Sequence, residues 1–345
     1  MIMRASNIEL LRIIAMLFVV LLHCNFAAIG YPSAASVSTA PLQEIIKMFF
    51  ENICIVSVNC FILISGYFSL RLSLQRLVRF WLQCFFYGVL IYIVVLLLKI
   101  ESFSLAATLT NTILWWLRDN WFICCYFALM LLAPIVNLLF ERAEVKQLRL
   151  CLLLLLVVDC VLGWFVGMKG NGTAGGYSVF HLLVVYYLGR FIYIVNQDEK
   201  PVKRSRFYLL SFIGLVVLNT ILAYVQIRCS LPLNMFSYNA PVVLLACVYF
   251  FMFFLYLDVK NSKLINFVAK SSFSVFLIHI HPLVFPLFKS YMCSLLENFG
   301  GGYYVLLSIV VALSLYGLSI VVDLMIRPIV KGLPSKLPSW EIKEI

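Results

Sequence analysis

The sequence contains very few charged residues. Only 12% of its 345 residues are Asp, Glu, Lys or Arg, whereas 64% are hydrophobic. A soluble globular protein has about twice that share of charge and about half apolar residues, so this scarcity excludes an ordinary soluble domain. We expect an integral membrane protein in which residues 1–345 form a single membrane domain, with no separate soluble domain.

Other signals are also missing. No CxxC pair or Cys/His spacing indicates a metal site, so we predict no metal. Most of the 11 cysteines lie in apolar runs, where Cys behaves as a small hydrophobe. Cys229 and Cys293 are the exceptions, since they lie near predicted outer loops and could pair. The first apolar stretch lacks a small-residue cleavage site, so we expect it to remain as a membrane helix. No internal repeat of the kind found in many transporters is visible.

Ten stretches are apolar and long enough to span a bilayer, at about 20 residues each. We therefore predict an all-α polytopic membrane protein with about ten transmembrane helices. The predicted spans lie near residues 8–30, 42–69, 80–98, 119–140, 150–167, 179–196, 207–227, 241–257, 271–291 and 304–326.

The positive charges fix the predicted orientation. Lys and Arg gather in every second connection, near residues 71–79, 142–149, 200–206 and 260–270, and in the C-terminal tail. The positive-inside rule places these segments and both termini in the cytoplasm. This distribution explains the net charge of +11 without a nucleic-acid partner.

Two charged or titratable residues stand in the first apolar stretch, IELLRIIAMLFVVLLHC. Arg12 and His23 are eleven residues apart, which is almost three helical turns, so both project from one helix face about 16 Å apart along the axis. An ionisable residue at membrane depth is costly unless it faces a cavity or a partner, so it indicates a functional site. Glu9, one turn before Arg12, can neutralise it.

Further polar residues interrupt later spans. Ser65 and Gly66, near the cytoplasmic end of the second span, allow close backbone approach or a helix break. Arg76 and Arg79 present two guanidinium groups on one side of a helix, a geometry suited to phosphate. Ordinary positive-inside anchoring explains the two arginines equally well.

The fourth span follows an unusual aromatic segment. Three tryptophans within residues 108–121 indicate an interfacial or re-entrant segment, either as an aromatic belt or as a substrate platform. Trp121 then opens the span, and Tyr126 and Asn137 lie eleven residues apart on a common face. In the ninth span, His279 is a better candidate for a shared cavity than His281, because Pro282 disturbs the helix beside the latter.

Together these segments resemble the integral-membrane acyltransferase type three family, in its stand-alone form. NIELLRIIAMLFVVLLH looks like the family's signature of Arg, ten residues and His, with Arg12 and His23 in those roles. FILISGYF followed by Arg76 and Arg79 is similar to its Ser-Gly-Tyr/Phe segment and Arg-x-x-Arg loop. WFICCYFALMLLAPIVN and KSSFSVFLIHIHPLV are similar to two later spans, with His279 in the His position.

The resemblance implies an enzyme of the bacterial cytoplasmic (inner) membrane that transfers an acetyl or other short acyl group from acyl-CoA to a glycan hydroxyl. It implies acetyl-CoA as donor substrate, no permanently bound cofactor, and capsule or O-antigen as acceptor. His23 would act as base or acyl carrier, and Arg12 would steer the CoA phosphates or stabilise charge in the site. Ser65, Arg76 and Arg79 would bind the donor. Glu9, Trp121, Tyr126, Asn137 and His279 would support the site or contact substrate.

Two other functions compete with this hypothesis. A transporter or flippase for a lipid-linked sugar or small solute also fits ten spans with intramembrane His and Arg. The missing repeats and the Arg-x-x-Arg segment on the nucleotide-accessible side count against it. A glycan polymerase often carries a large outer loop, and every predicted outer loop here is short.

Overall fold

The structure is a computed structural model that describes residues 5–167, 174–196 and 205–333. All elements in these ranges are helices, which confirms the all-α prediction. The chain divides into two compact units. Unit 1 contains Met1–Leu70 and Ile135–Ala269, and unit 2 contains Arg71–Pro134 and Lys270–Ile345.

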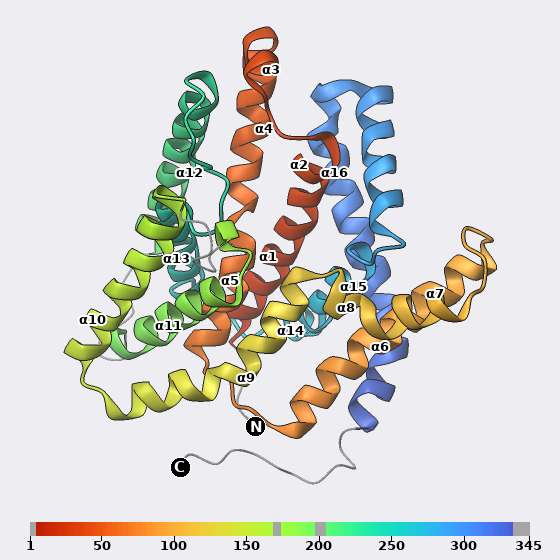
Figure 1. Cartoon of the computed structure of the whole chain (residues 1–345), viewed down its shortest axis with the longest axis horizontal. Helices are drawn as coiled ribbons and strands as arrows, with labels where there is room; N and C mark the ends of the chain where they lie inside the picture. Colours follow the sequence, from red (N-terminus) through yellow and green to blue (C-terminus); the bar gives the residue numbers. More distant parts are fainter. Residues whose placement is uncertain (1–4, 168–173, 197–204, 334–345) are drawn as a thin grey trace. The chain divides into compact units, whose positions relative to one another are not determined.

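Unit 1 is built around the N-terminal helices. These are α1 (Ser6–Cys24), α2 (Phe26–Ile29), α3 (Ala34–Thr39), α4 (Pro41–Cys54) and α5 (Val56–Tyr67). Later in the chain come α10 (Val145–Leu156), the π-helix η2 (Val157–Phe165), the 3-10 turn η3 (Ala174–Gly176), α11 (Val179–Val195), α12 (Ser205–Arg228), α13 (Pro241–Leu255) and α14 (Lys263–Val268). Helix α1 packs against α4, α5 and α13, and α5 also packs against α11 (Figure 1).

Unit 2 contains the remaining elements. They are α6 (Leu74–Leu97), α7 (Leu105–Leu109), the π-helix η1 (Thr110–Leu114), α8 (Trp115–Arg118), α15 (Ser272–His279) and α16 (Phe285–Gly332). Helix α6 packs against η1, α15 and α16. Two elements cross the division of the chain: α9 (Trp121–Arg142), divided after Pro134, and the 3-10 turn η4 (Ala269–Ser271).

Two glycines let α5 and α11 approach each other closely. A Cβ atom on Gly66 would lie 2.2 Å from the carbonyl oxygen of Tyr186, and one on Gly189 would lie 2.6 Å from that of Leu63. No side chain fits at either position, so the backbones themselves form the contact. The predicted close approach at Gly66 is confirmed.

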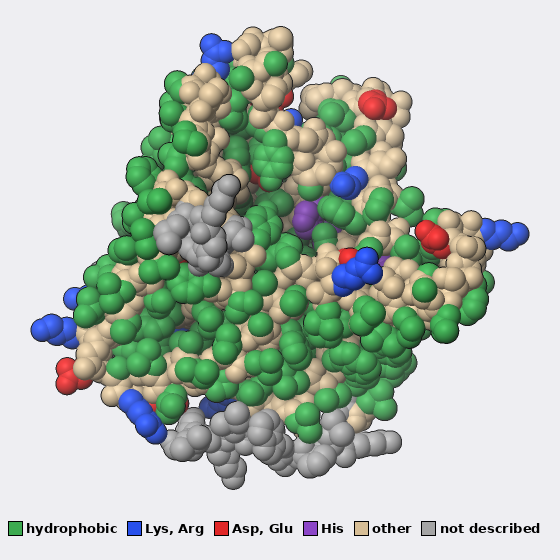
Figure 2. Space-filling view, viewed as in Figure 1, with side chains coloured by type: hydrophobic (Ala, Val, Ile, Leu, Met, Phe, Trp, Pro, Cys, Tyr) green, Lys and Arg blue, Asp and Glu red, His purple; other side chains and the backbone are tan. Residues whose placement is uncertain are grey.

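Seven described helices are long and apolar enough to cross a membrane: Ser6–Ile29, Pro41–Tyr67, Leu74–Leu97, Trp121–Arg142, Val145–Phe165, Ser205–Arg228 and Phe285–Gly332. Apolar side chains cover much of their visible surface (Figure 2). The predicted spans at 179–196 and 241–257 correspond to the shorter apolar helices Val179–Val195 and Pro241–Leu255. The count of about ten spans and the cytoplasmic termini therefore stay predictions.

The last two predicted spans have different boundaries in the structure. Helix α15 ends at His279, and α16 then continues through residues 292–303, which the sequence suggested as an outer loop. The one non-helical residue inside α16 is Gly300, whose φ of 70° is readily adopted only by glycine. The ribbon turns back there, so α16 has two arms (Figure 1).

Other helix boundaries also differ from the predicted ones. Helix α6 begins at Leu74, six residues before the predicted start of the third span. The aromatic segment before the fourth span folds as the three short helices α7, η1 and α8. Trp115 and Trp116 are buried, which contradicts an interfacial belt at these two positions. No disulfide bond joins Cys229 to Cys293 or any other two cysteines of the described residues. Lys200, Lys203, Arg204, Lys336 and Lys343, which contributed to the predicted orientation, lie outside the described residues.

Candidate functional site

Helix α1 carries Glu9, Arg12 and His23. An unbroken aliphatic run without Gly or Pro favours this helix, and it places Arg12 one turn after Glu9. The Nη1 atom of Arg12 lies 2.6 Å from Oε1 of Glu9, and the Glu9 side chain is 5% exposed against 32% for Arg12. The predicted neutralisation is confirmed: a buried carboxylate is paired with a cation that still reaches the surface of unit 1.

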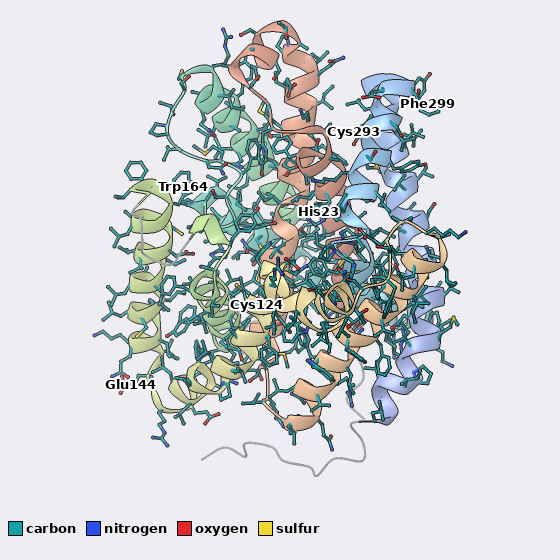
Figure 3. The ribbon with its side chains drawn as sticks, turned by 45° about the vertical axis from the view of Figure 1, so that its right-hand side comes forward. His23, Cys124, Glu144, Trp164, Cys293 and Phe299 are labelled. Carbon is teal, nitrogen blue, oxygen red and sulfur yellow. The ribbon has the colours of Figure 1, made fainter. Side chains whose placement is uncertain are left out.

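His23 stands on the last turn of α1 and is half-buried (Figure 3). The regular helix between Ser6 and Cys24 keeps it on the same face as Arg12, about 16 Å further along the axis. Both predicted catalytic residues therefore remain partly accessible, which a reacting group requires.

Helix α1 ends at Cys24, one residue after His23, because Asn25 leaves the helical conformation, with φ −86° and ψ −112°. The side-chain nitrogen of Asn25 donates to Oε2 of Glu51 at 2.8 Å and to the Lys47 carbonyl at 3.0 Å. Glu51, buried on α4, also accepts from the backbone N–H of Phe26, the first residue of α2. A carboxylate in this place satisfies a backbone donor that the helix break exposes.

A second buried network lies on η2, α11 and α5. His181 Nδ1 lies 2.7 Å from Asp159 Oδ2, and His181 Nε2 lies 2.9 Å from Asn59 Oδ1. All three side chains are fully buried. Asn239 donates to the Asp159 backbone carbonyl at 3.0 Å, which connects the network to the segment before α13.

The hydrogen bonds restrict the protons of this network. Asn59 Nδ2 donates to the Tyr238 carbonyl at 2.9 Å, so the amide oxygen faces His181 and Nε2 must donate to it. One further proton lies between Nδ1 and Asp159. Whichever atom holds that proton, the His181–Asp159 pair has no net charge, which suits a fully buried position.

Two predicted residues of unit 1 have structural partners. Asn137 donates to the Leu70 carbonyl at 2.9 Å, and its oxygen accepts from the Tyr186 hydroxyl at 2.8 Å. The Tyr186 hydroxyl in turn accepts from the Leu70 N–H at 3.0 Å, so both backbone groups of Leu70 are held. Ser65 is half-buried and donates to the Phe61 carbonyl in its own helix at 2.9 Å.

Arg76 and Arg79 lie in the first turns of α6, rather than in a connection before it. Both side chains are exposed, and Arg76 donates to the Arg71 carbonyl at 2.8 Å. Ser73 caps this helix end by accepting from the Arg76 N–H. Cations are unfavourable at a helix N-terminus, where the free N–H groups attract anions. The two exposed arginines make the start of α6 electropositive.

The remaining candidates belong to aromatic and buried parts of unit 2. Trp121 opens α9 with its ring 5.7 Å from Phe122, and Tyr126 packs 6.0 Å from Phe80. His279 is fully buried, and its Nδ1 donates to the Val275 carbonyl at 2.7 Å. This bond leaves Nε2 of His279 as the ring atom with a lone pair.

The serines before His279 have a partner that the sequence did not reveal. Asp323, buried on α16, accepts from Ser274 at 2.8 Å, from Ser271 at 3.0 Å and from Tyr87 at 3.3 Å. Arg327, one turn later, completes its coordination with an ion pair. Asp323 is therefore the acceptor at the centre of a buried hydrogen-bond network in unit 2.

Sequence reasoning missed Asn25, Glu51, Asp159 and His181. A usable signal existed for Asp159, because it stands alone in the apolar run LLLLLVVDCVLGWF. Glu51 gave little signal, since α4 carries two other charged side chains, Glu44 and Lys47.

The geometry thus defines a helical membrane protein with paired ionisable residues inside apolar helices. The family model described as an acyltransferase domain, of the acyltransferase 3 family, matches residues 6–325. The match covers nearly the whole chain, so the chain belongs to this family. No curated protein and no solved structure matches the chain significantly.

Proposed function

We propose that this protein is an O-acyltransferase of the bacterial cytoplasmic membrane. It moves an acetyl or other short acyl group from acyl-CoA to a hydroxyl of a cell-surface glycan, such as capsule or O-antigen. The observation that carries this proposal is the family match over residues 6–325, which includes both Arg12 and His23.

The donor binds at the start of α6. Arg76 and Arg79 are exposed there, and guanidinium groups bind phosphate oxygens in a bidentate manner. The phosphates of CoA are the matching anions. Ser65 and Arg12 complete the donor side of the proposal, with Glu9 holding the Arg12 guanidinium in place.

His23 activates the acceptor. As general base, its neutral imidazole takes the proton of the sugar hydroxyl while the hydroxyl oxygen attacks the thioester carbonyl. The carbon–sulfur bond breaks, the new ester forms, and the imidazolium returns the proton to the CoA thiolate. In the covalent variant, the imidazole first carries the acyl group and then transfers it to the hydroxyl. Trp121, Tyr126, Asn137 and His279 support the site in this proposal.

The proposed topology keeps ten spans with both termini in the cytoplasm. Helix α11 has 17 residues and α13 has 15, which correspond to about 26 and 23 Å. With a few flanking residues, both approach the roughly 30 Å of a hydrocarbon core. His23 then lies about 22 Å into the first span, on the side away from the positive loops.

The test uses membranes that contain the protein, radiolabelled acetyl-CoA, and glycan from cells with and without the gene. We expect label in base-labile esters only with the wild-type protein, and none with His23→Ala. An unchanged size-exclusion profile of the variant in detergent shows that it is folded. Solute movement without ester formation would contradict the proposal and support a carrier.

A further inference from the structure

Two tyrosines stand exposed on the loops beyond the end of α1. Tyr31, in the connection after α2, is 61% exposed, and Tyr177, directly after η3, is 44% exposed. Both belong to unit 1. The two hydroxyl groups interact electrostatically with each other and with the Glu51 carboxyl.

Each exposed ring rests on a buried aromatic ring. Tyr31 packs on Phe26 with ring centroids 4.7 Å apart, and Tyr177 packs on Tyr238 at 5.0 Å. Phe26 in turn meets Phe236, two residues before Tyr238, at 4.8 Å. The two exposed rings therefore share one buried base, formed by Phe26, Phe236 and Tyr238.

Residues 234–239, which carry Phe236 and Tyr238 of the base, are fixed by four hydrogen bonds from side chains elsewhere in unit 1. Trp164 bonds to the Asn234 carbonyl, Asn219 to the Met235 carbonyl, Gln226 to the Met235 N–H and Asn59 to the Tyr238 carbonyl. His181 bonds to Asn59 and Asp159 bonds to Asn239, so the buried network also fixes this segment. A loop fixed by a rigid scaffold in this way is typical of binding surfaces.

A glycine fixes the position of Tyr177. Gly176 has φ 90°, and a Cβ atom there would lie 2.5 Å from Cβ of Tyr238. Only glycine permits this contact, and it places Tyr177 directly against the base. The Tyr238 N–H also bonds to the Gly175 carbonyl at 3.1 Å, which ties η3 to the same segment.

The tyrosine hydroxyls keep their protons. The ordinary pKa of a phenol is about 10, so the Tyr31 and Tyr177 hydroxyls are protonated near neutral pH. Both groups therefore donate and accept hydrogen bonds at any physiological pH. The side chains of Tyr177 and Tyr238 are already hydrogen-bonded to each other.

These features match the chemistry of a sugar. A pyranose has an apolar C–H face that packs on an aromatic ring, and hydroxyls around its edge that exchange hydrogen bonds with tyrosine. Aromatic walls with a few convergent polar groups are what small-ligand sites generally present. A tyrosine that only anchors a helix in the membrane interface needs neither a shared rigid base nor a neighbouring carboxyl.

We propose that Tyr31 and Tyr177 bind the glycan acceptor, with one sugar ring stacked on their exposed faces. This inference rests on the proposed function and specifies its acceptor side. The base reaches the end of α1 through Phe26, whose ring packs on Phe236 and which lies three residues after His23 in the chain. A sugar on this surface is therefore next to the end of α1.

The experiment measures the KM for two substrates with the full-length protein in detergent. The donor is acetyl-CoA, and the acceptor probe is envelope polysaccharide extracted from a strain that lacks the gene. Tyr31→Ala and Tyr177→Ala should each raise the acceptor KM about tenfold, as expected for a lost aromatic stack, with the donor KM unchanged. Tyr31→Phe and Tyr177→Phe keep the ring packing, so smaller increases, of about threefold, are expected from them.

Tyr303→Ala serves as the matched control, because Tyr303 is 67% exposed but lies on α16, away from unit 1 in the chain. It should leave both KM values unchanged. An unchanged acceptor KM in all four variants would overturn the assignment, as would an increase in the donor KM alone. If the wild-type protein transfers no label, the proposed function fails first and this inference fails with it.

Discussion

Glu51 accepts a hydrogen bond from Asn25 across 2.8 Å and so fixes the point at which the first helix ends. Helix α1 could continue beyond Asn25 by composition alone, since the residues after Asn25 are FAAI. The break is therefore imposed by α4, another helix of the same unit. The position of His23 at a helix end depends on a carboxyl group that is distant in sequence.

Replacing Glu51 tests this dependence. Glu51→Ala removes the acceptor for both Asn25 and the Phe26 N–H, and it should destabilise the protein by about 1–3 kcal/mol for each buried donor left without a partner. Glu51→Gln keeps one carbonyl oxygen and should lose less. Thermal unfolding in detergent measures both, with Gln43→Ala, an exposed position on the same helix, as control. Equal midpoints for Glu51→Ala and the control would show that the break does not need the carboxyl.

The Asp159–His181 pair should behave as one unit. Removing either partner leaves the other polar and buried, at a cost of roughly 3–5 kcal/mol. The double variant Asp159→Ala/His181→Ala should cost less than the sum of the two single variants, with a coupling energy of at least about 1 kcal/mol. Denaturation midpoints of the four proteins complete this cycle. Strictly additive losses would contradict the shared proton.

The glycine contact between α5 and α11 can be tested by comparing two glycine-to-alanine substitutions. Gly66→Ala puts a methyl group 2.2 Å from a backbone oxygen, so the helices must separate and the protein should be strongly destabilised. Gly214→Ala, on α12, meets nothing within 4 Å and should be neutral or stabilise by up to about 1 kcal/mol. Expression level and melting temperature of the two variants measure this difference. A normal melting temperature for Gly66→Ala would disprove the backbone contact.

The arginines at the start of α6 should affect the donor alone. The double variant Arg76→Ala/Arg79→Ala should raise the KM for acetyl-CoA roughly tenfold, about 1.4 kcal/mol, with a stable fold and an unchanged acceptor KM. Arg149→Ala removes an exposed cation of α10 and controls for the loss of general positive charge. If Arg149→Ala raises the KM for acetyl-CoA equally, Arg76 and Arg79 act only through the general positive electrostatic potential of the protein.

The sequence best predicted the residues whose free-energy cost of burial in an apolar segment is evident without knowing their partners. An Arg or a His in an aliphatic run is such a residue, so Arg12 and His23 were found, and the i, i+3 spacing was enough to predict the Glu9–Arg12 pair. The helical class followed in the same way from composition and run length.

Partners from distant segments were not predictable. Asn25 looks like a turn residue until Glu51 is seen beside it, and Ser271 and Ser274 look like small helix residues until Asp323 is placed. Helix boundaries failed for a related reason. Gly300 reverses the chain through one backbone angle, and hydropathy cannot distinguish that from a longer polar loop.

The network of Asp159 and His181 has a consequence for how the chain enters the membrane. The two residues stand on consecutive apolar segments, Val145–Phe165 and Val179–Val195. Inserting an unpaired Asp at the centre of a helix costs about 3 kcal/mol on the scale of the insertion machinery. If the two segments leave the ribosome and partition as one hairpin, the carboxyl can find its imidazole before it meets lipid. Biogenesis of this part of the protein should therefore proceed in pairs of helices, and a chain truncated before α11 should retain its upstream segment poorly in the bilayer.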